Sequence, residues 1–159
     1  MTDWHARKKV GDQHEHRVAR ELEDRGWTVQ FCGQGTYPAA IQQALSRTDS
    51  HLRQFPDLIA ARGTDVITID AKTRMPSLRT GRYAISRKCL NAGLQFLGTY
   101  APIPLYYVFG QMSVLTPAEI MHYGSTGFRS PDGSYYLVNS HLAHRFDDVF
   151  GAPASLMTA

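Results

Sequence analysis

The chain has 159 residues, 43% of them hydrophobic, a size that predicts a single domain over 1–159 with a substantial core. Lysine and arginine outnumber aspartate and glutamate by 17 to 14, a mild basicity that is compatible with a nucleic-acid partner but does not require one. No stretch reaches the about 18 apolar residues of a membrane helix, and the two cysteines lack the C-x-x-C spacing of thiolate zinc sites, so we expect a cytoplasmic protein without membrane contact.

The first element is a helix predicted over residues 4–25. Its apolar stripe recurs every four residues, at Val10, His14, Val18 and Leu22. Gly26 ends the helix, and residues 27–31 form a first strand. Because His14 and His16 point about 200° apart on a helix, they cannot hold one ion, and we expect His14 to be a partly buried helix histidine.

Glu15 lies beside the apolar stripe, so it borders the core instead of facing away from it. This is an unusual place for a glutamate. Two interpretations stay open: a role in a polar site at the edge of the core, or an ion pair with one of the many arginines and lysines on the same helix.

A hairpin is predicted over residues 58–72, from two short β-branched strands, 58–62 and 66–72, with a Gly-Thr-Asp connection between them. Side chains alternate along a strand, so Asp70 and Lys72 point to the same face. Asp57 begins the first strand, directly after Pro56, and the hairpin returns it toward Asp70.

Two carboxylates a few ångströms apart repel each other unless a cation lies between them, and Mg²⁺ prefers one or two carboxylates with waters and phosphate oxygens. Asp57 and Asp70 are therefore candidate metal ligands, and Lys72 is a candidate for orienting a water molecule. The alternative is that Asp57 caps a turn while Asp70 and Lys72 form a surface ion pair.

No acidic residue occurs between positions 71 and 118. The basic residues after Lys72 in this stretch are candidate phosphate contacts: Arg74, Arg79, Arg82, Arg87 and Lys88. Residues 75–82 are predicted to form a loop and 85–99 an amphipathic helix. A strand over 104–110, a helix that starts at Thr116 with Pro117 in its first turn, a strand over 134–138 and a short helix or irregular segment over 141–150 complete the chain.

Pro56-Asp57 followed 13 positions later by Asp70-Ala71-Lys72 resembles the motif of the PD-(D/E)xK nucleases, which include restriction endonucleases and archaeal Holliday-junction resolvases. The resemblance implies an α/β fold with a restriction-endonuclease-like mixed central sheet flanked by helices, over about residues 8–110, and a C-terminal β/α extension over 111–159. Glu15 is similar in its position to a glutamate that contributes to the metal site of junction resolvases. Between Cys32 and Phe55 the chain departs from those resolvases, which have a short loop here. In this inserted segment an additional helix followed by a short turn is predicted over residues 38–53.

The resemblance implies an Mg²⁺-dependent endonuclease that hydrolyses DNA phosphodiester bonds, with Mn²⁺ able to substitute and no small-molecule cofactor. In it Asp57, Asp70 and Glu15 would hold the metal, and Lys72 would position or help to deprotonate water. The alternatives are a resolvase of branched DNA and a non-catalytic DNA-binding module on the same fold.

We also expect a homodimer, because cutting both strands of a duplex needs two active sites and two-fold symmetry supplies the second. The aromatic segments 106–109 and 135–136 are candidate interface surface. The alternative is that both are central strands buried on two faces.

Overall fold

The computed structural model describes residues 2–130 and 133–154. The helices are α1 (Thr2–Glu23), α2 (Ala39–Ser46), α3 (Arg87–Tyr100), α4 (Pro117–Tyr123) and α5 (Phe146–Phe150), with short 3₁₀ helices η1 (Gln34–Thr36), η2 (His51–Gln54) and η3 (Ser140–Leu142). The strands are β1 (Thr28–Phe31), β2 (Leu58–Arg62), β3 (Asp65–Lys72), β4 (Arg82–Ser86), β5 (Leu105–Phe109), β6 (Ser113–Leu115), β7 (Ser125–Ser130), β8 (Gly133–Asn139) and β9 (His144–Arg145).

The described residues form two sheets. The larger has the strand order β1-β2-β3-β5-β6-β9, and the smaller has the order β4-β8-β7. Strand β3 runs parallel to β5, whereas β1–β2, β2–β3, β5–β6 and β6–β9 are antiparallel, so the central sheet is mixed as expected. The α3 helix forms the crossover that a parallel pair requires.

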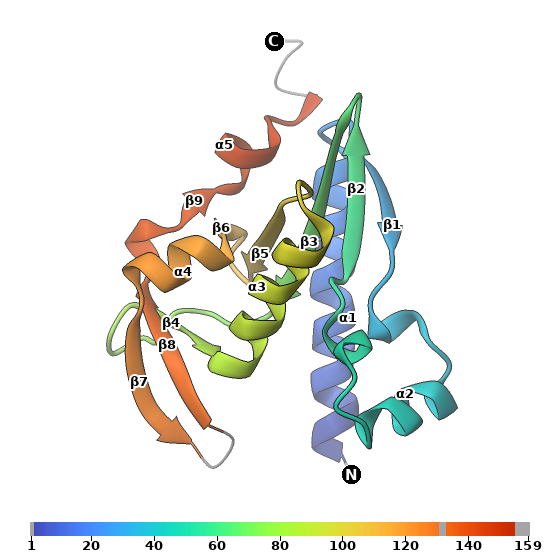
Figure 1. The fold of residues 1–159 in the computed structure, drawn as a ribbon. Helices are drawn as coiled ribbons and strands as arrows, with labels where there is room; N and C mark the ends of the chain where they lie inside the picture. The colour runs from blue at the N-terminus through green and yellow to red at the C-terminus, as the bar shows by residue number, and fades with distance from the viewer. Residues whose placement is uncertain (1, 131–132, 155–159) are drawn as a thin grey trace.

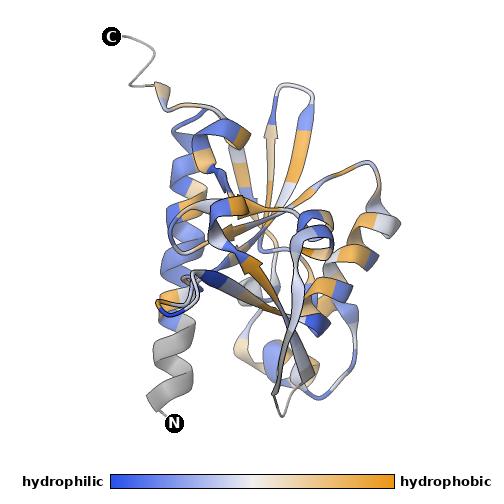
Figure 2. Ribbon diagram, turned by 90° about the vertical axis from the view of Figure 1, so that its left-hand side faces the viewer, coloured by the Kyte–Doolittle hydropathy of each residue, from blue (hydrophilic) through white to orange (hydrophobic). Residues whose placement is uncertain are grey.

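Helices cover both faces of the central sheet (Figure 1). One hydrophobic cluster lies between α1, the sheet and α5, and includes Val18, Leu22 and Ile69. A second cluster lies between α3, α4, the sheet and the smaller sheet, and includes Leu90, Tyr107 and Ile120. Figure 2 shows apolar residues concentrated on the central strands and polar residues on much of the helix surface. Within the part of the chain that is described, no helix combines the length and the apolar character needed to cross a membrane.

The predicted hairpin is confirmed, with a shorter connection than expected. Arg62 pairs with Asp65, so Asp65 belongs to the second strand and only two residues form the turn. Gly63 has a φ of 61°, a left-handed conformation that glycine adopts without steric cost. The start of α4 is also confirmed: Thr116 and Glu119 form a capping box, and Pro117 follows the cap.

The prediction was wrong around residues 82–86, because Arg82 was assigned to a loop and residues 85–86 to the start of a helix. They form strand β4, and α3 begins only at Arg87, where the Ser86 side chain accepts a hydrogen bond from the Cys89 amide. Tyr83 and Ile85 are buried on one face of β4 because they pair with β8, which lies far along the chain. Strands β6, β7 and β9 were not expected either.

Residues 106–109 do not offer an interface surface. Tyr107, Val108 and Phe109 are completely buried, because β5 lies between β3 and β6 with helices on both sides. The alternative that this segment is a central strand is therefore correct. Tyr135 and Tyr136 are partly exposed.

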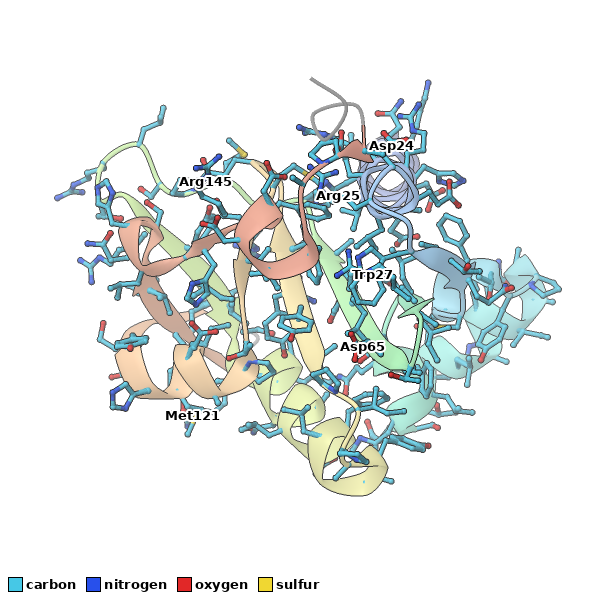
Figure 3. The ribbon with its side chains drawn as sticks, turned by 90° about the horizontal axis from the view of Figure 1, so that it is seen from above. Asp24, Arg25, Trp27, Asp65, Met121 and Arg145 are labelled. Carbon is cyan, nitrogen blue, oxygen red and sulfur yellow. The ribbon has the colours of Figure 1, made fainter. Side chains whose placement is uncertain are left out.

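Two side chains that directly follow α1, Arg25 and Trp27, bind the C-terminal part of the described chain (Figure 3). Arg25 forms ion pairs with Glu21 and with Asp147 of α5. The Trp27 indole N–H donates to the carbonyl of Phe150 over 2.9 Å. These contacts close the cluster beneath α1 and hold that helix against the sheet.

We predict opposite effects for two glycine substitutions on α3. A Cβ at Gly93 would overlap the hydroxyl of the fully buried Tyr107, so Gly93→Ala should lower the free energy of unfolding by about 1–3 kcal/mol. A Cβ at Gly98 would meet no atom within 4 Å, so Gly98→Ala should raise it by about 0.5–1 kcal/mol. Urea unfolding measures both, and equal effects of the two substitutions would contradict the packing described for α3.

Candidate active site

The β2–β3 hairpin brings the two aspartates of the sequence motif together. Asp57 directly precedes β2, and Leu58 pairs with Ile69, so Asp57 lies next to Asp70 across the hairpin. One oxygen of Asp57, Oδ2, accepts a hydrogen bond from the Ala71 amide over 2.8 Å. This bond fixes one carboxylate oxygen and leaves Oδ1 for another partner.

Glu15 joins the aspartates from α1. Burial, followed by the nearby charges of Asp12 and Asp70, raises the pKa of Glu15, and the charge of Glu15 in turn acts on Asp57. The position of α1 is set one residue earlier, where His14 Nε2–H donates to the Val108 carbonyl over 2.9 Å. His14 is buried on the inner face of the helix, as predicted, and burial lowers its pKa.

Asp57 is held in an environment that disfavours its charge. Burial comes first, and the charges of Asp70 and Glu15 add to it, so the pKa of Asp57 is raised well above its usual range. The backbone also encloses it, because an added Cβ at Gly33 would lie 2.9 Å from Asp57 Cα and 3.0 Å from Oδ1. Only a glycine at position 33 lets the start of the inserted segment approach the carboxylate this closely.

Lys72 is the basic group beside the acids. Its Nζ lies 2.8 Å from Asp70 Oδ2, and the two side chains are 24% and 20% exposed. Burial works to lower the pKa of Lys72, but attraction to Asp70 outweighs it and raises the pKa above its usual value. The ammonium also lies 5.4 Å from the ring centre of Tyr107. Lys72 is therefore a positioned cation that donates N–H groups.

Three carboxylates and one ammonium therefore meet at one end of the hairpin. Their hard oxygen donors fit a divalent cation such as Mg²⁺, which would relieve the repulsion that raises the pKa of Asp57. Among residues 2–130 and 133–154, no group of three or more His, Cys, Asp or Glu side chains is placed so that together they could coordinate one metal ion. Mg²⁺ commonly keeps several waters and few carboxylates, so the site fits that ion better than one that needs a complete protein cage.

The predicted phosphate contacts are divided over the surface. Arg74 and Lys88 line the same cavity of about 360 Å³ as Lys72, together with Tyr135 and Cys89. Arg87 lies one residue from Lys88 and is exposed. Neither Arg79 nor Arg82 lines that cavity. Arg79 is exposed in the loop before β4, and Arg82 pairs with Asn139 in β8.

Sequence reasoning missed Gly33, Tyr107, Cys89 and Tyr135 as neighbours of the site. Gly33 belongs to a G-x-G segment that has no specific meaning by itself, and its role depends on a backbone contact with Asp57. Tyr107 and Cys89 face Lys72 from β5 and α3, and nothing in the local sequence indicates that meeting.

We predict that Asp57→Asn stabilises the metal-free protein at neutral pH. Because the pKa of Asp57 is raised in the folded state, the stability that its protonated form contributes is complete below about pH 4 and is lost as the pH rises through the folded value. Asparagine keeps the shape and an oxygen acceptor for the Ala71 amide. Thermal melts in EDTA at pH 7.5 should show a gain of about 0.5–2 kcal/mol.

The matched control is Asp24→Asn at an exposed position, which should change stability by less than about 0.5 kcal/mol. The gain of Asp57→Asn should shrink as the pH falls toward 4. A destabilised Asp57→Asn protein at pH 7.5 would contradict the crowding of charge described above.

Comparisons with known proteins identify the fold. The chain matches no family model and no curated protein. Its structure is similar to that of Hjc, a Holliday junction resolvase from the hyperthermophilic archaeon Archaeoglobus fulgidus, with a TM-score of 0.52 and 15% sequence identity over 89% of this chain and 95% of that one. The expected fold class is thus confirmed: the chain has the mixed α/β, restriction-endonuclease-like fold of this resolvase.

Proposed function

We propose that this protein is a divalent-metal-dependent endonuclease that hydrolyses DNA phosphodiester bonds. The observation that carries the proposal is the meeting of Glu15, Asp57, Asp70 and Lys72 at one end of the hairpin. An ion pair on the surface of a hairpin would not explain why a third carboxylate arrives from α1, or why the backbone at Gly33 encloses Asp57. The similarity of the fold to that of a resolvase supports this chemistry by analogy.

Each residue has a role that follows from its environment. Asp57 and Asp70 would hold Mg²⁺ or Mn²⁺, with Glu15 as the third carboxylate. The ion, when bound, would stabilise negative charge on the scissile phosphate. Lys72, kept protonated by Asp70, would donate N–H groups to the attacking water or to a phosphate oxygen, a role in positioning and charge stabilisation.

The neighbouring cations support a nucleic-acid substrate. Arg74 and Lys88 face the same cavity as Lys72, so a phosphodiester backbone that reaches the acids would pass beside both. Arg74 lies 5.5 Å from the ring centre of Tyr135, a pairing that offers an aromatic surface next to a cation. Cleavage of both strands would need a second copy of the site, so we retain the homodimer as part of the proposal.

We predict that Asp70→Asn abolishes cleavage and leaves the fold intact. The substitution preserves shape but removes a charged ligand, and the loss of several kcal/mol of charge stabilisation corresponds to a fall in rate of about 100-fold or more. The test measures cleavage of plasmid, linear duplex, single strand and four-way junction in Mg²⁺ and in Mn²⁺. The junction is included because the similar resolvase acts on that structure.

The control is Asp65→Asn, an exposed acid at the other end of β3. This variant should cleave at the wild-type rate. Equal cleavage by Asp70→Asn and wild type would refute the proposed site, and DNA binding without cleavage in either metal would favour the non-catalytic module.

A further inference from the structure

A second cationic cavity lies between the inserted segment and α3. Its volume is about 440 Å³, and its lining includes His51, Arg53, Arg87, Lys88, Asn91 and Gln95. Lys88 also lines the cavity beside Lys72, so the two cavities meet at the first turn of α3. The part of the inserted segment that lies against α3 is η2, whereas α2 lies farther from α3 (Figure 1).

Among the described residues, the positive charge of this cavity is not balanced by ion pairs, although Arg87 lies 5.8 Å from the ring centre of Tyr136. In the part of the chain that the structure describes, Arg53, Arg87 and Lys88 take part in no ion pair, and Asp49 is the acid among the lining residues. Arg87 and Lys88 occupy the first turn of α3, where a cation opposes the helix dipole and weakens the helix. The helix dipole therefore gives no reason for two cations at this turn.

The inserted segment packs against α3 and forms one side of this cavity. Phe55, directly after η2, packs edge-to-face on Phe96 and on Tyr100 of α3, with ring centres 5.5 Å and 6.1 Å apart. Arg53 Nη1 donates to the Thr48 carbonyl over 3.0 Å. A guanidinium carries five N–H donors, so this one bond orients the group and leaves donors for a phosphate.

We propose that this cavity holds the DNA strand next to the scissile phosphate, with Arg53 and Arg87 each contacting a backbone phosphate. The inference rests on the proposed function and extends it, because it places a substrate contact on the inserted segment. Asn91 and Gln95 supply amide groups that can donate to and accept from sugar or base atoms. A DNA strand is the occupant that fits best. The cavity is lined by cations for phosphates and by amides for sugar or base atoms, and it shares Lys88 with the cavity beside Lys72.

The test measures the affinity of full-length protein for a fluorescent DNA duplex and single strand in EDTA, across a series of salt concentrations. Arg53→Gln keeps a donor for Thr48, and Arg87→Ala removes the second cation. Each should lower the slope of log affinity against log salt by about 0.7–0.9 and weaken binding about 3- to 10-fold near 0.1 M salt. Arg47→Ala, on the same inserted segment but outside the cavity, should match wild type.

Wild-type cleavage in Mg²⁺ separates this inference from the proposed function, and thermal melts establish that each variant is folded. If wild type cleaves DNA while folded Arg53→Gln and Arg87→Ala keep the wild-type slope, the inference is overturned and the nuclease stands. If wild type neither binds nor cleaves DNA, both are overturned. Reduced slopes in both variants, with Arg47→Ala unchanged, support the inference.

Discussion

The structure around the candidate site is constrained by the mutual repulsion of Glu15, Asp57 and Asp70. The ammonium of Lys72, which pairs with Asp70, relieves part of this repulsion. Burial of Asp57 next to the other acids raises its pKa, so the metal-free protein carries an unfavourable charge arrangement that its fold must hold in place. The His14 bond to β5 positions α1, the hairpin register positions Asp70, and the close approach of Gly33 encloses Asp57. Elements far apart in the chain thus converge on one group of charges.

An arrangement of this kind has a cost that packing alone does not explain. Acids that serve only solubility lie apart on the surface, whereas Asp57 is placed where its ionised form is opposed by burial and by its neighbours. Perturbed acids that share a site with a positioned lysine are typical of functional centres, where stability is given up for chemistry. The cationic first turn of α3 shows the same pattern with the opposite sign of charge, and it lies at the junction of the two cavities.

The features predicted correctly from sequence are those with local causes. The β2–β3 hairpin follows from a β-branched pattern and a Gly-containing turn, and the start of α4 follows from a capping box with proline. Strand β4 was missed because its pairing partner β8 comes late in the chain, and because Ile85 was included in the amphipathic helix that follows. Non-local pairing of this kind leaves little trace in a short window of sequence.

The candidate site divides in the same way. Asp57, Asp70 and Lys72 could be predicted because they share one hairpin, and Glu15 was a candidate because it borders an apolar stripe. Gly33 and Arg53 could not be predicted, because each acts through a contact that only the folded inserted segment creates. Aromatic residues 106–109 were ambiguous for a related reason, since a buried central strand and an exposed interface strand have the same composition.

Direct measurement of metal binding tests the central claim most sharply. Mn²⁺ is titrated calorimetrically into metal-free wild type and into a variant that combines Asp57→Asn with Asp70→Asn, after both are shown to be folded. The structure predicts saturable binding to wild type, loss of that binding in the double variant, and competition by Mg²⁺. Equal Mn²⁺ binding by the two proteins, or no binding to wild type at millimolar Mn²⁺, would contradict the assignment of these carboxylates to a metal site.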